Sequence, residues 1–346
     1  MKVIFLGTPE FSLPTLEALY NSKHEIVGII SQPDKIQDRG KKIVFSPVKE
    51  FAMKHDLNLM QFDKISRDGV ESIRSLEPDI MVTASYGQII SQEIIDIPKH
   101  GIINVHASLL PDFRGASPIQ TAIIKGCKET GVTIMQTEAG LDTGDIILKS
   151  KLEIGENETA GELSERLAVL GAELTLEALE RIESGTVEYI KQSHIEAVVT
   201  KKISKEEGRI VWEKSAEQLK CQILGQNPSP VAFSYLNNLM CKIYRAEVVS
   251  PEEVSDTREA VGTIIPPTSA KKGLFVQCGK GVLKITELQF PGGKILAGSD
   301  AINGRKVNVG DVFSYCEEVK PLNPIMLTKQ GDIKQLRTVT PKKQND

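Results

Sequence analysis

The most informative part of the sequence brings together an amide, an imidazole and a carboxylate. Asn104 and His106 precede a loop that contains Pro and Gly, and Asp142 lies in a second turn-forming segment, residues 140–145. Residues two apart on an extended strand point to the same side, so Asn104 and His106 can aim two donors at one oxygen. No Cys or second His stands at metal-ligand spacing around them. This pattern favours metal-free acyl-type transfer, in which a developing oxyanion is stabilised.

Each of these side chains also has a plain structural explanation when it is considered alone. A histidine at the end of a strand is commonly structural, and an asparagine in a turn often bridges backbone groups. Asp142 could close a turn, and Asp145, three residues later, is an equally acceptable carboxylate. A carboxylate beside His106 is expected to favour the charged imidazolium. The residues alone leave the choice between Asp142 and Asp145 open.

The same stretch resembles the signature of the folate-dependent formyltransferases. The resemblance rests on residues 104–106, 108–119 and 141–145, of which the run 108–119 is the most specific. Supporting segments are residues 2–11, 32–34, 39–42, 46–49, 131–136 and 202–207. The similarity spans roughly residues 1–310, and the wider pattern is most similar to the family members that act on methionyl-tRNA. Three positions depart from the family pattern: Asp38, Ser85 and Ser229.

The resemblance implies a reaction and the residues that carry it. Asn104 and His106 would stabilise the oxyanion that forms at a formyl carbon, and Asp142 would organise protons through water. The formyl donor would be 10-formyltetrahydrofolate, the acceptor would be the α-amino group of initiator methionyl-tRNA, and no metal would be needed. The implied folate-contacting residues are Ser108, Leu109, Leu110, Pro111, Tyr86 and Gly87.

Basic residues gather in two regions that could contact RNA. The loop between residues 32 and 46 holds four of them, Lys35, Arg39, Lys41 and Lys42. The resemblance places the Arg39 position in a loop that enters the acceptor stem of the tRNA. Residues 1–200 carry 20 basic and 30 acidic side chains, whereas residues 201–346 carry 22 and 16. A basic second part suggests a polyanionic partner, although lysines that merely keep a domain soluble give the same balance. The candidates there are Lys201, Lys205 and Arg209.

Short apolar runs alternate with amphipathic stretches in the first half of the chain. The runs are typical of buried strands and lie at residues 3–6, 26–30, 80–84, 102–106 and 132–137. Helical patterns lie at residues 14–20, 48–55, 70–76 and 160–184, and residues 31–46 form a polar loop. Strands separated by helices predict a Rossmann-like α/β fold, with a parallel sheet covered on both faces. Ligands bind beyond the carboxyl ends of such strands, where Asn104, His106 and Asp142 would lie.

The second half has a different pattern of short apolar runs with turn residues between them. Such runs predict a small, OB-like β-barrel, and a helical pattern at residues 216–224 precedes it. We therefore expect a formyltransferase catalytic domain at 1–190, a linker at 191–203, and a tRNA-binding barrel at 204–316. The polar segment 317–346 is expected to be a weakly ordered tail.

The composition is that of a globular protein without a membrane anchor. Hydrophobic residues make up 40% of the chain and charged residues 25%, and no apolar run approaches the ~20 residues of a membrane helix. The first strand pattern begins at Val3, which leaves no room for a leader peptide. Five scattered cysteines fit reduced thiols and argue against a zinc site. We expect a cytoplasmic monomer.

Two other functions fit parts of the sequence. A formyltransferase for a small amine, such as glycinamide ribonucleotide or a sugar nucleotide, would share the first domain but would not need the basic second half. A non-catalytic RNA-binding protein could have the same fold, but nothing in that role requires Asn104, His106 and Asp142 together. The joint presence of the three side chains favours an enzyme.

Overall fold

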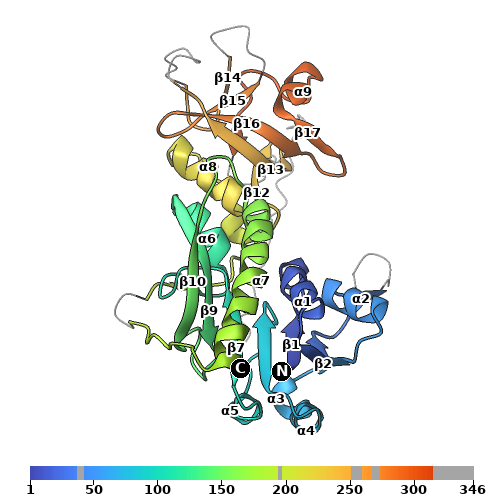
Figure 1. Ribbon diagram of the computed structural model, residues 1–346. Helices are drawn as coiled ribbons and strands as arrows, with labels where there is room; N and C mark the ends of the chain where they lie inside the picture. Colours follow the sequence, from blue (N-terminus) through green and yellow to red (C-terminus); the bar gives the residue numbers. More distant parts are fainter. Residues whose placement is uncertain (37–42, 194–196, 251–258, 267–272, 315–346) are drawn as a thin grey trace, which may run out of the picture.

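Seven strands form the central sheet of the first half of the chain in the computed structural model, which describes residues 1–36, 43–193, 197–250, 259–266 and 273–314 (Figure 1). Their order across the sheet is β10 (Ile146–Glu153), β9 (Glu129–Gln136), β7 (Ile102–His106), β6 (Ile80–Ala84), β1 (Lys2–Gly7), β2 (Glu25–Ser31) and β5 (Leu59–Gln61). β9 runs antiparallel to β7 and β10, and the other strands share one direction. The expectation of a parallel sheet therefore holds for six strands and is wrong for β9.

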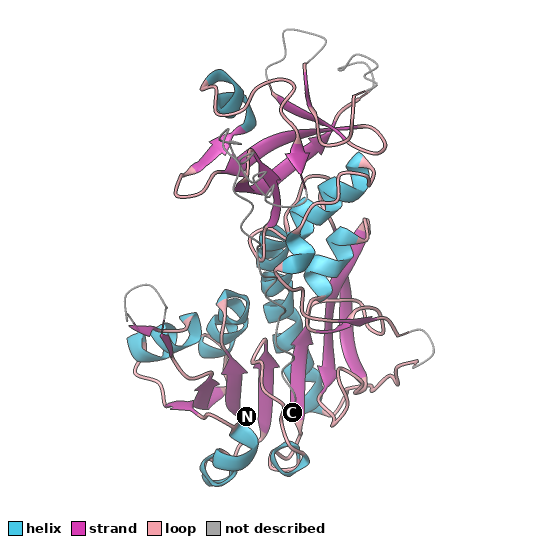
Figure 2. Cartoon of the chain, turned by 180° about the vertical axis from the view of Figure 1, so that it is seen from behind, coloured by secondary structure: helices cyan, strands magenta, loops and turns pink. Residues whose placement is uncertain are grey.

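Helices cover both faces of this sheet, as the alternation along β1 requires. Val3 and Phe5 pack into a cluster with the helices α1 (Leu13–Tyr20), α2 (Pro47–Lys54) and α7 (Ala160–Ser184). Ile4 and Leu6 point the other way, against α3 (Ile65–Asp68), α4 (Val70–Ser75) and α5 (Gln92–Ile95). Figure 2 shows these two layers from behind.

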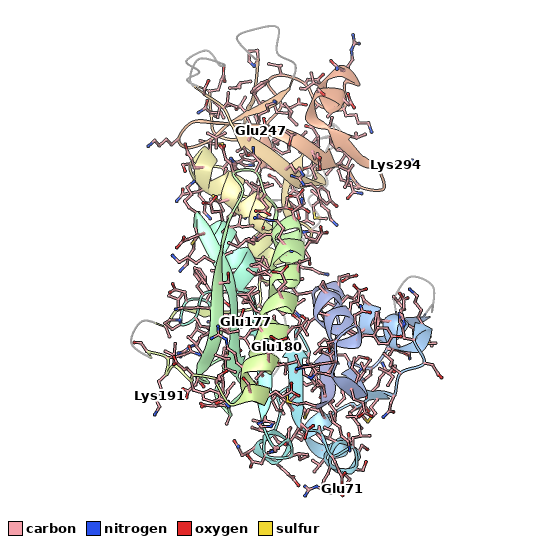
Figure 3. All side chains as sticks on the ribbon, viewed as in Figure 1. Glu71, Glu177, Glu180, Lys191, Glu247 and Lys294 are labelled. Atoms are coloured by element: carbon pink, nitrogen blue, oxygen red, sulfur yellow. The ribbon has the colours of Figure 1, made fainter. Side chains whose placement is uncertain are left out.

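The long helix α7 has the bounds that its apolar pattern predicts, because both of its ends carry clear signals. Thr159 and Glu162 form a capping box at the first turn, and Gly185 ends the helix in a left-handed conformation with φ 71°. Its buried face includes Leu163, Leu167, Leu174 and Leu179. Glu177 and Glu180 lie on the exposed face (Figure 3). The helix spans the sheet and reaches the second half of the chain (Figure 1).

An antiparallel sheet curls into a nearly closed barrel in the second half, which confirms the predicted barrel. The strand order is β14 (Ile264–Ile265), β15 (Leu274–Gln277), β16 (Val282–Gln289), β13 (Leu239–Val248), β12 (Ala232–Leu236) and β18 (Phe313–Ser314), with β17 (Ile295–Ala297) beside β16. A bridge between Thr263 and Val312 joins the two edges. The core includes Trp212, whose Nε1 donates to Ser234 Oγ at 3.0 Å. Helices α8 (Ala216–Gly225) and α9 (Gly298–Asn303) complete this half.

The two halves meet where α8 packs on α6 (Pro118–Ile124), beside the first turns of α7 (Figure 1). Gly161 N–H donates to the Asn227 carbonyl at 3.0 Å, and the Arg245 guanidinium pairs with Glu162.

The pattern of the sequence did not predict α6, β5 or β10. Within the expected polar loop, β3 (Lys35–Ile36) pairs with β4 (Ile43–Val44).

The segment expected to be a linker packs against the first half. β11 (Val199–Thr200) pairs with β8 (Arg114–Gly115), and Gln192 is buried. Gly115 has φ 103°, and a Cβ there would lie 2.3 Å from the Thr200 carbonyl oxygen, so this approach requires glycine. Residues 191–193 and 197–201 are thus part of the wall around the signature loop. The expected tail, residues 317–346, lies outside the described residues.

Candidate active site

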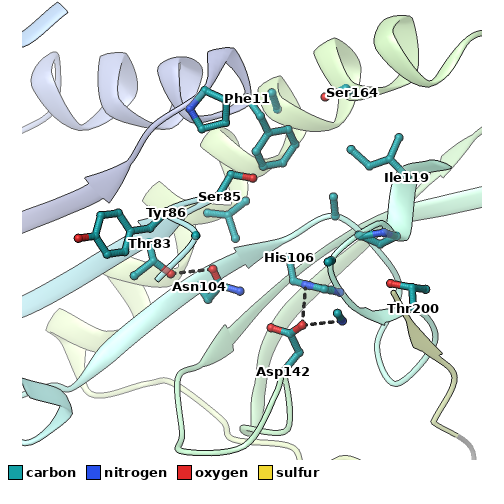
Figure 4. A pocket seen from close by; sticks show the side chains of 18 of the residues that line it. Phe11, Thr83, Ser85, Tyr86, Asn104, His106, Ile119, Asp142, Ser164 and Thr200 are labelled. Carbon is teal, nitrogen blue, oxygen red and sulfur yellow. Dashed lines mark hydrogen bonds and ion pairs between the residues drawn. The ribbon is translucent and has the colours of Figure 1, made fainter. Parts of the chain in front are cut away.

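A cavity of about 1360 Å³ opens beyond the carboxyl ends of β6 and β7. Asn104, His106 and Asp142 all line it, together with residues from α6, α7 and the turn after β9. The second half contributes Pro228 and Ser229 to the same wall. The structure therefore brings the three predicted side chains into one space (Figure 4).

Asn104 is oriented by the neighbouring strand. The parallel register of β6 and β7 sets Thr83 beside Asn104, and the Thr83 hydroxyl donates to Asn104 Oδ1 at 2.6 Å. Because the oxygen is engaged on that side, the NH₂ group lies on the side of His106 in Figure 4. Asn104 thus presents a fixed donor to the cavity. Thr83 was not predicted, because its role depends on strand register.

His106 is held as a neutral imidazole with a defined tautomer. Its ring Nε2 lies 3.0 Å from the Phe113 carbonyl oxygen, which can only accept, so Nε2 carries the hydrogen. Nδ1 is then the free nitrogen, 3.7 Å from Asp142 Oδ2. The side chain is only 7% exposed. Nδ1 is therefore available to take a proton at the place where the cavity meets Asp142.

Burial lowers the pKa of His106 below its ordinary 6.5, and this effect outweighs the nearby Asp142, which raises it. The hydrogen bond to Phe113 also raises this pKa, whereas the Arg114 charge lowers it. The expectation that Asp142 favours the imidazolium is thus confirmed in direction, but burial has the larger effect on this ring. At neutral pH the imidazole is uncharged.

The stability of the protein should depend on this buried imidazole. The unfolded chain takes up the proton near pH 6.5 and the folded ring does not, so stability should fall as the pH drops from about 7 through the folded-state pKa. The pKa of His24 is also lowered by burial and adds to the same loss. We expect the urea midpoint to fall between about pH 7 and pH 5, and to fall less in His106→Gln. A His106 pKa above 6.5 by NMR titration would contradict this account.

Asp142, and not Asp145, lies beside His106. It is held by one hydrogen bond to its side chain and one to its backbone carbonyl. Its Oδ2 accepts from Gly115 N–H at 2.7 Å, and its φ of 51° is in the left-handed region. Its carbonyl accepts from Gln192 Nε2 at 3.0 Å. Asp145 does not line the cavity within the part of the chain that the structure describes. The geometry therefore favours Asp142 as the carboxylate partner of His106.

The predicted folate-contacting residues separate into two groups. Tyr86 and Gly87 line the cavity, although the Tyr86 ring packs among apolar side chains behind it, where burial raises the pKa of Tyr86 to about 12. The other four, Ser108, Leu109, Leu110 and Pro111, are not among the described lining residues. Folate contact by these four residues stays a prediction.

The loop 108–111 is held in place by contacts with β9 and β10. The Thr133 hydroxyl on β9 donates to the Ser108 carbonyl at 2.7 Å and accepts from Leu110 N–H at 3.1 Å. Leu110 is fully buried and packs against Met135 and Ile146. These contacts fix the start of the loop that returns to Phe113 and Gly115, the residues that hold His106 and Asp142.

The structure describes four of the seven predicted RNA-contacting residues. Lys201, Lys205 and Arg209 are exposed, and Lys201 directly follows Thr200, which lines the cavity. Lys35 begins β3, whereas Arg39, Lys41 and Lys42 lie outside the described residues. Their contact with RNA stays a prediction.

Two kinds of feature are absent from the described residues. No three or more His, Cys, Asp or Glu side chains there are arranged to hold a metal ion. No helix in the same residues is long and apolar enough to cross a membrane.

Comparison with known proteins gives matches along most of the chain. Residues 1–179 match the family model "Formyl transferase" and residues 202–306 match "Formyl transferase, C-terminal domain". The chain is 44% identical to the methionyl-tRNA formyltransferase of Acetivibrio thermocellus over 314 residues, covering 90% of this chain and 99% of that protein. It is 42% identical to the one from Ruminiclostridium cellulolyticum, with the same two coverages.

Solved structures share the fold at lower identity. The sugar 3N-formyl transferase WlaRD matches with a TM-score of 0.60 and 19% identity, covering 85% of this chain and 99% of that one. HypX from Aquifex aeolicus, solved with tetrahydrofolic acid, matches with a TM-score of 0.58 and 18% identity, covering 87% of this chain and 46% of that one. Taken with the family models and the close relatives, these findings show that the chain belongs to the formyl transferase family.

Proposed function

We propose that this protein transfers the formyl group of 10-formyltetrahydrofolate to the α-amino group of methionine esterified to initiator tRNA. The observation that carries the reaction type is the convergence of Asn104, His106 and Asp142 on one cavity. Support for the acceptor comes from relatives up to 44% identical that are named methionyl-tRNA formyltransferase. We further propose that the enzyme acts in the cytoplasm as a monomer.

The three side chains suit the proton and charge movements of formyl transfer. As the neutral amine attacks the formyl carbon, the carbonyl oxygen becomes an oxyanion that the Asn104 NH₂ group stabilises. His106 Nδ1 accepts the proton that the amine loses, and the resulting imidazolium adds a second charge-stabilising group beside the oxyanion. The same proton then passes to the nitrogen of tetrahydrofolate as the carbon–nitrogen bond breaks.

Asp142 stabilises the imidazolium form of His106, which arises when the ring accepts the proton of the amine. Its Oδ2 is 3.7 Å from Nδ1, too far for a direct hydrogen bond, and a water that contacts both atoms would complete the link. Because burial keeps His106 neutral beforehand, the imidazole is ready to act as a base at neutral pH.

The cavity fits a folate together with a second substrate. Its volume of about 1360 Å³ exceeds the roughly 300–1000 Å³ of a pocket for one small molecule. Three lining side chains, Ile89, Leu141 and Val169, are 87%, 62% and 53% exposed. Apolar surface left open in a cavity suits the flat rings of a folate.

The position of the barrel supports an acceptor that is larger than a free amine. Pro228 and Ser229 of the second half line the cavity, so a molecule that binds there touches both halves. Exposed Lys201, Lys205 and Arg209 follow the cavity residue Thr200 along the chain and could contact phosphates. These observations favour the tRNA over a small nucleotide.

The test is formyl transfer from 10-formyltetrahydrofolate with methionyl initiator tRNA and glycinamide ribonucleotide offered in parallel. We expect formyl-methionyl-tRNA as the product, with a rate that falls at higher salt because phosphate contacts are screened. Formylation of glycinamide ribonucleotide alone would retain the chemistry and overturn the acceptor. No transfer to either acceptor would overturn the proposed reaction.

A further inference from the structure

Gln192 joins two loops of the active site through all of its polar atoms. Its Oε1 accepts from Arg114 Nε at 3.0 Å and from Arg114 Nη2 at 2.7 Å. Its Nε2 donates to the carbonyls of Asp142 at 3.0 Å and Gly144 at 2.7 Å. The residue is only 8% exposed. A buried amide with two acceptor and two donor bonds has one stable orientation.

These bonds form a closed chain of contacts around the catalytic carboxylate. Gly115 N–H holds Asp142 Oδ2, while the neighbouring Arg114 side chain holds Gln192, which in turn holds the Asp142 carbonyl. Asp142 is therefore held at its side chain by Gly115 and at its backbone carbonyl by Gln192, which is itself held by Arg114. This double attachment maintains a left-handed backbone at φ 51°, a conformation that is costly for a residue other than glycine.

Gln192 belongs to the segment that leads from the first half of the chain to the barrel. Farther along this segment, Thr200 Oγ1 donates to the Arg114 carbonyl at 3.0 Å and accepts from Ser117 N–H at 3.1 Å. The segment is thus attached to the signature loop at two places, one on either side of residues 194–196. The described residues on both sides of that gap therefore contact the loops that hold Asp142.

We propose that Gln192 is a positioning residue for catalysis: it holds the Asp142 loop so that the carboxylate stays next to His106 Nδ1. This role rests on the proposed function, in which Asp142 supports the charged imidazole. The two donor bonds to Asp142 and Gly144 are the essential ones. The two acceptor bonds serve to orient the amide against the buried Arg114 guanidinium.

Two substitutions separate these donor bonds from the acceptor bonds. Gln192→Met has a similar volume and loses all four bonds. Gln192→Glu keeps oxygen acceptors for Arg114 but loses both donors. With methionyl-tRNA at saturation, we expect kcat to fall about 10-fold to 100-fold in both variants with little change in KM, because a displacement of about 1 Å in a catalytic group has effects of that size.

The matched control is Gln222→Met in α8. Gln222 is 7% exposed, and its Nε2 also donates to two backbone carbonyls, those of Glu207 at 3.1 Å and Arg209 at 3.0 Å. It does not line the cavity in the described part of the chain. We expect Gln222→Met to lose stability and to keep kcat. An equal loss of kcat in the control, or a normal kcat in Gln192→Met, would overturn the proposal.

A readout that does not depend on activity is the pKa of His106, followed by NMR and assigned with a His106→Gln sample. Asp142 raises this pKa in the intact site, so a displaced carboxylate should lower it further in Gln192→Met. An unchanged pKa, or a normal kcat in Gln192→Glu, would overturn the positioning role. If the wild-type protein forms no formyl product but the pKa still falls, the proposed reaction fails while the link from Gln192 to Asp142 stands.

Discussion

Replacement of His106 by alanine is expected to lower kcat by about 10²-fold to 10⁴-fold, the usual contribution of a positioned general acid or base. His106 Nδ1 is the free ring nitrogen at the cavity, because Nε2 is engaged with the Phe113 carbonyl at 3.0 Å. Without it, the amine's proton has no buried acceptor next to Asp142. Single-turnover formylation of methionyl-tRNA would measure the loss directly and separate it from substrate binding.

The appropriate control for this experiment is another buried histidine. His24 is 7% exposed and its pKa is also lowered, first by burial. It lies next to the first residue of the chain and does not line the cavity within the described residues. His24→Ala should therefore lose stability and keep kcat. A wild-type kcat in His106→Ala would remove the proton-transfer role from this residue.

The sequence predicts the fold well where a local pattern determines the structure. β1, β6 and β7 are short apolar runs. α7, 25 residues long, has an apolar pattern with helical periodicity, a capping box at its start and a glycine at its end. The alternation along β7 likewise predicts that Asn104 and His106 share a side of the strand, and both line one cavity. Such information is contained in neighbouring residues.

The remaining features depend on contacts between distant residues. Apolar content makes β9 a strand but does not give its direction, which is set by pairing with β7 and β10. Gln192 lies in a polar stretch typical of a linker, and its partners are Arg114 and Asp142, 78 and 50 positions away. The burial of His106 also depends on the whole fold, and it lowers the pKa of the ring by more than the predicted effect of Asp142 raises it.

The second large effect is expected for Asn104→Asp, which keeps the shape of the side chain but removes its NH₂ donor. In the wild-type protein the Thr83 hydroxyl lies 2.6 Å from Asn104 Oδ1, and an aspartate oxygen at the same place can still accept from it. The missing donor alone should lower kcat by about 10²-fold to 10³-fold, and a carboxylate beside the oxyanion should add repulsion. KM for both substrates should change little, since the oxyanion exists only during the reaction.

Thr83→Val tests whether the orientation of Asn104 matters as well as its presence. Valine keeps the volume of threonine but cannot donate to Asn104 Oδ1, so the amide becomes free to turn its NH₂ group away from the cavity. We expect a smaller loss of kcat, roughly tenfold, because the donor is still present for part of the time. Equal losses in Thr83→Val and Asn104→Asp would assign Thr83 a direct contact with the reacting groups. Normal kcat in Asn104→Asp would overturn the proposed role of Asn104, whose NH₂ group is oriented toward the cavity by the Thr83 hydroxyl, in stabilising the oxyanion.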